Sequence, residues 1–277
     1  MHIRSASPAD EASFCSLWQR AFGDSEEFAR FVFTRYAGSR HIYIAEEGGV
    51  FAAMLCAIPG SLGDHPGVYL YGLATEPEFR RQGIMSALIE WTCRAERTRS
   101  AQFALLVPAG SGLFDYYAKR GFRTAFYRCV ELIPRPARPA PVCTLRAPRA
   151  AAYFDLQETF LPAGRFLFNP SPRRAIISAL STDGAQVVET AEGFGLFAPD
   201  EGGNIVCWEL GAPSYEAASG VLAAAADALE LPMIACRLPW PSPAAPHAPP
   251  HPYAMVRFLD AAFDLGEAPY LALDLGI

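Results

Sequence analysis

The sequence lacks the patterns that place a chain in several common classes. Its seven cysteines form no Cys-x-x-Cys pair and no cysteine–histidine cluster with zinc-ligand spacing. No apolar run reaches the roughly 18 residues that a membrane-spanning helix needs. The N-terminus, MHIRSASPAD, has no apolar segment of the signal-peptide kind. We therefore expect buried free thiols in a reducing compartment, and a soluble cytoplasmic protein without a metal site or a membrane partner.

An excess of positive charge is also absent. The net charge is −6 and the pI is about 5.4, so bulk charge does not attract nucleic acid. An acidic chain suits a cationic substrate better, although net charge alone decides little. Hydrophobic residues make up 51% of the 277 residues, which is ample for a packed core. The length indicates one large domain or two small ones.

Apolar periodicity divides the first 135 residues into alternating helices and strands. Ser7 can cap a helix that opens at Pro8, and Gly23 can end it. Two β-type runs flank Glu47-Gly48-Gly49, which predicts a hairpin. We expect helices over about 8–22, 25–37, 83–97 and 111–120, and strands over 2–6, 41–46, 50–58, 68–75, 102–107 and 122–132.

A segment rich in proline and arginine, residues 134–149, then indicates a linker. After it the order of elements restarts, which predicts a diverged duplication with a period of about 140 residues. The repeat ends at residues 239–253, where seven prolines exclude a helix. In the second half we expect helices to Phe160 and over 171–181 and 214–229, strands over 143–147, 185–189, 193–198, 204–210 and 231–237, and apolar runs over 254–259 and 270–275.

The most informative segment joins a strand that ends at Thr75 to a helix that begins near Gly83. The first N–H groups of a helix lack internal partners, and the helix dipole is positive at that end. A glycine at such a turn lets backbone approach a phosphate closely, and flanking arginines add positive charge. We therefore predict that a phosphate or pyrophosphate binds at Arg80, Arg81, Gln82, Gly83, Ile84 and Met85.

This spacing resembles the acyl-CoA loop of the GNAT acetyltransferases, R/Q-x-x-G-x-G/A. Arg80 takes the first position and Gly83 the fourth, whereas Met85 departs at the sixth, where Gly or Ala is usual. The resemblance implies that acetyl-CoA is the co-substrate, and that its pantetheine arm lies along Leu73, Ala74 and Thr75. The chain has no GxxxxGK[ST] or GxGxxG pattern, which argues against another kind of nucleotide enzyme.

A second similarity places Tyr117 34 residues after Gly83 (117 minus 83). Residues 117–122 resemble the family's Y-x-K-x-G-F segment, whose tyrosine protonates the leaving thiolate of CoA in many members. The resemblance therefore gives that role to Tyr117, with Tyr116 and Tyr127 as rivals. The Asn that often opens this helix in the family is missing, because Pro108-Ala109-Gly110-Ser111 stands there.

No residue stands out in the sequence as a general base. Carboxylates in hairpins and loops are usually solvated, and Asp24-Ser25-Glu26-Glu27 also suits the positive end of the helix that follows it. We expect Cys93 to belong to the core. The groups nearest to the predicted site in sequence are Glu46, Glu47, Asp64, His65, Glu76 and Glu78.

The wider layout resembles the enhanced-intracellular-survival branch of the GNAT superfamily. It implies an α/β fold of two GNAT-like halves, each a mixed, mostly antiparallel sheet flanked by helices. We expect a catalytic domain over 1–135, a proline-rich linker over 136–144 and a degenerate GNAT-like domain over 145–277. In the second half, Pro213 removes an N–H and Glu216 adds negative charge where the phosphate loop would lie, so one CoA is expected per chain.

The reaction expected is acetyl transfer from acetyl-CoA to a primary amine by direct attack in a ternary complex, without a metal. The acceptor is a small molecule or a peptide. The alternative is a non-catalytic acyl-CoA-binding sensor or scaffold: the missing Asn and the lack of an obvious base favour it, and Tyr117 opposes it. The identity of the amine stays open, as does the oligomeric state, with a homo-oligomer among the alternatives.

Overall fold

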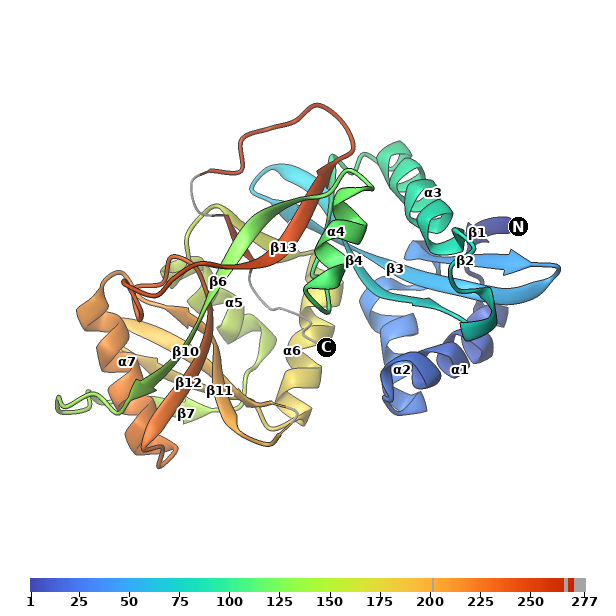
Figure 1. Cartoon of the computed structure of the whole chain (residues 1–277). Helices are drawn as coiled ribbons and strands as arrows, with labels where there is room; N and C mark the ends of the chain where they lie inside the picture. The colour runs from blue at the N-terminus through green and yellow to red at the C-terminus, as the bar shows by residue number, and fades with distance from the viewer. Residues whose placement is uncertain (201, 267–268, 272–277) are drawn as a thin grey trace.

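Two α/β lobes lie side by side in the computed structural model, which describes residues 1–200, 202–266 and 269–271 (Figure 1). The first lobe, from the N-terminal half, contains β1 (His2–Ser5), α1 (Glu11–Phe22), α2 (Glu26–Phe31), β2 (Ile42–Glu47), β3 (Val50–Leu62), β4 (His65–Thr75), α3 (Ile84–Thr98), β5 (Phe103–Leu106), α4 (Gly112–Ala118) and β6 (Arg123–Pro134).

The second lobe repeats much of this order. Its elements are β7 (Thr144–Arg146), α5 (Ala150–Phe160), β8 (Arg165–Phe168), α6 (Pro170–Thr182), β9 (Gln186–Thr190), β10 (Gly193–Pro199), β11 (Ile205–Gly211), α7 (Tyr215–Ala228), β12 (Met233–Pro239), β13 (His251–Phe258) and β14 (Tyr270–Leu271). No helix or strand covers residues 135–143 or 240–250.

The strands form one continuous sheet, with the order β1-β2-β3-β4-β5-β13-β6-β12-β11-β10-β9-β7 and with β8 and β14 off this path. Neighbours on the path are antiparallel except for the parallel pairs β4–β5 and β11–β12. Helices flank the sheet in both lobes. The predicted α/β fold, with mixed and mostly antiparallel sheets, is therefore what the chain adopts.

Strand β13 links the two lobes, although it comes from the end of the chain. It lies between β5 and β6 of the first lobe, with Met255 opposite Leu106 and Val256 opposite Arg123. Beyond Arg128, β6 leaves β13 and pairs with β12 of the second lobe instead. Figure 1 shows β6 in green and β13 in red crossing the middle of the molecule. The two lobes consequently share backbone hydrogen bonds as well as side-chain packing.

Alternation along β4 divides the first lobe into two packed faces. Tyr69 and Tyr71 lie in a buried cluster with Trp18 of α1, while Val68 and Leu70 lie in another with Leu88 of α3. The α1 helix forms because apolar residues recur at helical spacing, and it ends at Gly23, whose left-handed backbone (φ +80°) lets its N–H donate to the Gln19 carbonyl. The sheet therefore separates an α1 face from an α3 face.

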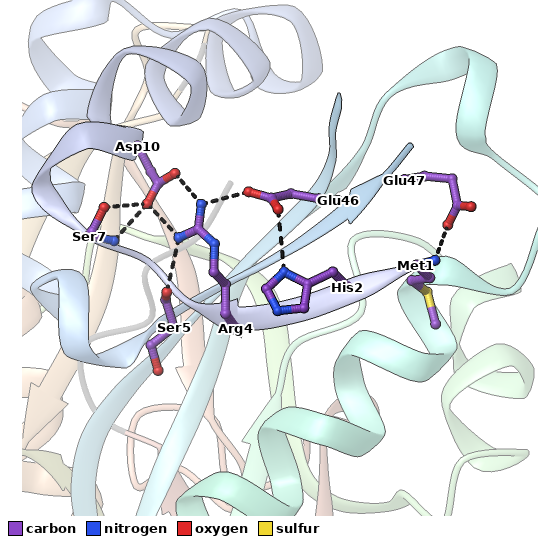
Figure 2. A network of polar contacts seen from close by, with 8 residues as sticks. All are labelled: Met1, His2, Arg4, Ser5, Ser7, Asp10, Glu46 and Glu47. Carbon is purple, nitrogen blue, oxygen red and sulfur yellow. Dashed lines mark hydrogen bonds and ion pairs between the residues drawn. The ribbon is translucent and has the colours of Figure 1, made fainter. Parts of the chain in front are cut away.

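A charged network fixes the N-terminal strand to the start of α1 and to β2 (Figure 2). Arg4 forms two 2.8 Å hydrogen bonds with the Asp10 carboxylate and a 2.6 Å bond with Glu46. Asp10 also accepts hydrogen bonds from the N–H and the hydroxyl of Ser7. The Arg4 hydrogen bonds hold the pKa of Asp10 well below its usual range. This network orients the hairpin that precedes β4.

The structure differs from the sequence expectation at two elements. The helix expected over 25–37 is α-helical only through α2 and continues as a π-helical segment, Val32–Ala37. Strand β8 was not expected, and it pairs with the end of β3. Within the described residues, no helix is long and apolar enough to cross a membrane, and no group of three or more metal-ligating side chains gathers.

Candidate active site

The loop between β4 and α3 has the geometry of an anion site. Arg81 and Gly83 both adopt left-handed backbone (φ +61° and +82°), and residues 80–83 are exposed. The structure records no backbone hydrogen bond from the N–H groups of residues 81–83, and the first N–H groups of α3 lack partners by geometry. A Cβ built on Gly83 would meet nothing within 4 Å. A phosphate can therefore approach this backbone from solvent.

Side chains around the loop hold its shape. Arg80 Nε donates to the Thr75 carbonyl at 3.1 Å, and Gln82 Nε2 donates to the Glu78 carbonyl at 2.9 Å. Ile84 is buried and Met85 half-buried, both against the α3 face, so these two residues can meet a ligand mainly through their N–H groups. Of the six residues predicted from the sequence to bind phosphate, the four at 80–83 are exposed to solvent.

The strand that leads into the loop has an unpaired edge. β4 pairs with β5 only from Gly67 to Tyr69, after which the two strands separate. A bulge sets Gly72 and Leu73 opposite one residue of β3. Gly72 has φ +61°, and a Cβ there would lie 2.3 Å from Trp18 Cζ3, so only glycine fits. Leu73, Ala74 and Thr75 follow this bulge, on the edge that β5 leaves open.

Tyr117 of α4 lies in the wall of the resulting opening. Its side chain is 7% exposed, and burial is the main cause that raises its pKa to about 12, so the hydroxyl is protonated at neutral pH. No group in the described part of the chain forms a hydrogen bond with this hydroxyl. Among its rivals, Tyr116 is in contact with Ser86 and lies under the Arg120 guanidinium, and Tyr127 packs against Trp240.

A cavity of about 590 Å³ opens between the separated ends of β4 and β5. On the first lobe it is lined by β4 residues 69–73, by the segment 107–109 and by Tyr117. On the second lobe it is lined by Pro199, Asp200, Gly202, Trp208 and Arg237, and Arg128 and Tyr253 of the shared strands complete it. The cavity therefore receives residues from both halves of the chain.

The carboxylates considered as bases lie elsewhere or are already paired. Glu46 binds Arg4, and Glu47 lies 3.0 Å from the N-terminal amine (Figure 2). Glu76 is buried and ion-paired with Arg20. Asp64 and Glu78 are exposed, and neither lines the cavity. Each of these five carboxylates is therefore either held in an ion pair or exposed to solvent, and none of them lines the cavity as a base.

Three other candidate groups also have structural roles. His65 stacks on Phe263 at 3.7 Å and forms a 2.7 Å hydrogen bond with Gln102. In the acidic stretch, Asp24 accepts a hydrogen bond from Trp18, and Ser25 caps α2. Cys93 is buried, which raises the pKa of its thiol to about 12 and keeps it un-ionised.

The second-lobe and shared-strand residues of the cavity were missed by the sequence reasoning. Arg128 and Arg237 stand in alternating strand sequence, Asp200 in a turn and Trp208 on β11. None belongs to a recognisable pattern, and their meeting depends on the pairing of β6 with β12. The signal that could have drawn attention to them is weak: Arg237 is the one charged residue of β12, whereas Arg128 shares β6 with Arg123 and Glu131.

A family match covers the first half of the chain, and solved structures match almost the whole of it. Residues 2–125 match the family described as Acetyltransferase (GNAT) domain. No curated protein matches the chain in sequence. The match includes the loop and Tyr117.

Solved structures share the fold over almost the full length. The chain resembles Eis1 from Mycobacterium abscessus with a TM-score of 0.73 and 17% identity, over 94% of this chain and 74% of that one. It resembles a GCN5-related N-acetyltransferase from Anabaena variabilis with a TM-score of 0.71 and 18% identity, over 94% and 73%. A tandem GNAT protein from the clavulanic acid biosynthesis pathway gives 0.59 and 11%, over 95% and 100%.

At these identities the structural matches establish the fold, and the family match establishes the kind of domain in the first half. The loop at the start of α3 and the separated strands β4 and β5 lie within the residues that the family model matches. Residues 2–125 therefore match a GNAT acetyltransferase domain, and the whole chain shares the fold of Eis1 and of the tandem GNAT protein.

Proposed function

We propose that the protein transfers an acetyl group from acetyl-CoA to a primary amine, and that the first lobe holds the cofactor. One observation carries this proposal: a loop with unpaired N–H groups opens α3, and beside it lies a cavity at the β4–β5 separation, walled by Tyr117. An anion site and a protonated acid are thus found on the two sides of one opening. Acetyl-CoA has an anionic pyrophosphate and a thioester that fit this arrangement.

The residues present fit the co-substrate at each of its parts. The pyrophosphate would lie on the N–H groups of residues 81–85 beside Arg80 and Arg81, because helix N-termini and guanidinium groups both favour phosphate. The pantetheine arm would run along the open edge of β4 at Leu73, Ala74 and Thr75, where no strand competes for the backbone. No metal is needed for these contacts.

The chemistry then follows in a ternary complex. The amine nitrogen attacks the thioester carbonyl carbon, and a backbone N–H of the β4 bulge stabilises the oxyanion. The C–S bond breaks as the amide forms, and the sulfur leaves as a thiolate. Tyr117 donates its proton to that sulfur, since its high pKa keeps the phenol protonated until the thiolate develops.

The amine must reach the carbonyl in its neutral form. The one described carboxylate that lines the cavity, Asp200, is a poor base, because hydrogen bonds from the N–H groups of Asn204 and Gly202 lower its pKa. We therefore assign the proton of the amine to water in the cavity, which returns a proton to the Tyr117 phenolate after the thiol has formed. The acceptor in this account is a small molecule or a peptide that presents a primary amine.

The proposal divides the chain into a catalytic domain over 1–135, a linker over 136–144 and a second domain over 145–277 without a CoA loop. In support, the segment equivalent to the phosphate loop precedes α7, where the Ser214 hydroxyl accepts the N–H of Ala217. Pro213 removes a further donor there. The second lobe would contribute the far wall of the cavity and no cofactor site.

The experiment is release of CoA thiol from acetyl-CoA with a panel of primary amines, combined with mass spectrometry of the acetylated product. We expect thiol release that depends on one class of amine and equals the amide formed. Binding of acetyl-CoA without amide formation from any amine of the panel would favour the alternative, an acyl-CoA sensor.

A further inference from the structure

The acceptor side of the cavity carries two arginines close together. Arg128 on β6 is opposite Pro239, and Arg237 on β12 is opposite Val130, so the two arginines are diagonal neighbours on one face of the sheet. Such neighbours have Cα atoms about 7–8 Å apart. Both arginines line the cavity. Two guanidinium groups therefore point into one space, where they repel each other unless an anion joins them.

Aromatic rings hold these guanidinium groups in place. The Cζ of Arg128 lies 4.8 Å from the centre of the Tyr253 ring, and that of Arg237 lies 5.0 Å from the centre of the Trp208 ring. A guanidinium that stacks on a ring keeps the N–H groups at its edge free. These N–H groups can form bidentate hydrogen bonds with a planar carboxylate or a tetrahedral phosphate. The pair is thus preoriented for an anionic ligand.

Protein carboxylates supply little of the negative charge that this pair needs. Arg128 forms no ion pair with any residue in 1–200, 202–266 or 269–271. Arg237 has one, with Asp200 at 3.5 Å, a long distance for such a pair. The other carboxylate oxygen of Asp200 already accepts the N–H groups of Gly202 and Asn204 at 2.9 Å. In the described part of the cavity, positive charge is in excess.

The position of the pair distinguishes it from the cofactor site. Ile84 and Met85 of the loop and Tyr117 pack on the α3 face of the sheet, with Leu88. Tyr253, on which Arg128 stacks, belongs to the buried cluster of the opposite face with Tyr69 and Tyr71. An anion at the arginines therefore belongs to a molecule that enters from the side opposite to the pyrophosphate.

We propose that the acyl acceptor is an amine that also carries a carboxylate or a phosphate, bound by Arg128 and Arg237, with an apolar or aromatic part against Tyr69, Tyr71 and Trp208. This inference rests on the proposed function, and it narrows the acceptor to anionic amines. It reverses the expectation drawn from the net charge of −6, because the local charge of the cavity wall decides recognition. Polycationic amines are poor acceptors on this account.

The first experiment measures binding of ring compounds that differ in charge: benzoate, benzyl alcohol and benzylamine, each titrated into the full chain in the presence of CoA. Benzoate should bind, and its affinity should fall about 10- to 100-fold in Arg128→Gln and Arg237→Gln, the effect of losing a charge-assisted hydrogen bond. CoA affinity should stay the same. Arg123→Gln, which changes an exposed arginine of β6 that does not line the cavity, is the matched control.

The second experiment compares amines as acceptors in pairs, phenylalanine with phenethylamine and phosphoethanolamine with ethanolamine. The anionic member of at least one pair should have a kcat/KM higher by tenfold or more, and the pair that responds separates carboxylate from phosphate. Arg128→Gln and Arg237→Gln should remove that preference.

Three results would overturn the inference: binding of benzylamine or benzyl alcohol as tight as that of benzoate, benzoate binding that is unchanged in both variants, or a parallel loss of CoA affinity. If benzoate binds through the arginines and no amine is acetylated, the anion site stands and the acetyltransferase proposal fails. If cationic amines are acetylated faster than anionic ones, the acetyltransferase proposal stands and the inference fails.

Discussion

The hydroxyl of Tyr117 is the acid in our account, and its replacement tests that role at the scale of one residue. Tyr117→Phe removes one oxygen and leaves the ring, which packs against Phe122 and Tyr116. We predict that kcat falls about 10²- to 10⁴-fold, the usual contribution of a positioned acid. Acetyl-CoA affinity should barely change. Steady-state and single-turnover kinetics check this, and Tyr116→Phe is the control, since its ring lies outside the cavity lining.

The raised pKa of Tyr117 also predicts how kcat/KM depends on pH. A phenol with a pKa of about 12 keeps its proton below that pH. Tyr117 should therefore still donate a proton to the sulfur at every pH up to about 10. The fraction of neutral amine rises with pH. A profile of kcat/KM should therefore rise and level off. A fall in wild-type kcat/KM near pH 9 that is absent in Tyr117→Phe would contradict the assignment.

The bulge in β4 is the feature that matters most at the scale of one element. Gly72 is in the left-handed region and in contact with Trp18, so Gly72→Ala adds backbone strain and an overlap with the indole. We predict a loss of about 2–4 kcal/mol of stability, of which roughly 1–2 is strain and the rest overpacking. Gly48→Ala has comparable φ (+57°) with nothing within 4 Å, so it isolates the strain. Denaturant unfolding of both variants is the measurement, and equal losses would contradict the account.

The elements also show which parts of the structure the sequence could predict. The loop at 80–85 could be predicted because its glycine, its arginines and the start of α3 are neighbours in the chain. The hairpin at Gly48 and Gly49 and the end of α1 at Gly23 were equally local. Arg128 and Arg237 could not be recognised as cavity residues, because their meeting depends on the register of β6 and β12, more than 100 residues apart (237 minus 128 is 109).

At the scale of the whole molecule, β13 makes the first lobe depend on the end of the chain. Sequence reasoning assigned residues 251–258 to the second half because it followed the order of the chain. The order of strands in a sheet can differ from their order in the sequence. In the structure β5 and β6 do not pair with each other but with β13. A lobe built from residues 1–135 would expose two strand edges and part of its core.

We therefore predict that residues 1–135 expressed alone do not fold cooperatively, although they hold the loop and Tyr117. Addition of a peptide with the sequence of residues 250–260 should partly restore structure, because it supplies the missing strand. Circular dichroism and thermal melting are the measurements. A cooperative transition of residues 1–135 without the peptide would show that the first lobe is an independent domain.

The most direct test of the central claim is calorimetric titration of acetyl-CoA into the full chain. The account predicts one molecule bound per chain, at the loop that opens α3. Arg80→Glu should weaken binding by about 1.5–3 kcal/mol, the scale of a charge-assisted hydrogen bond, while Arg94→Glu, exposed farther along the same helix, should not. A stoichiometry of two or of zero, or equal affinity in the wild type and Arg80→Glu, would contradict it.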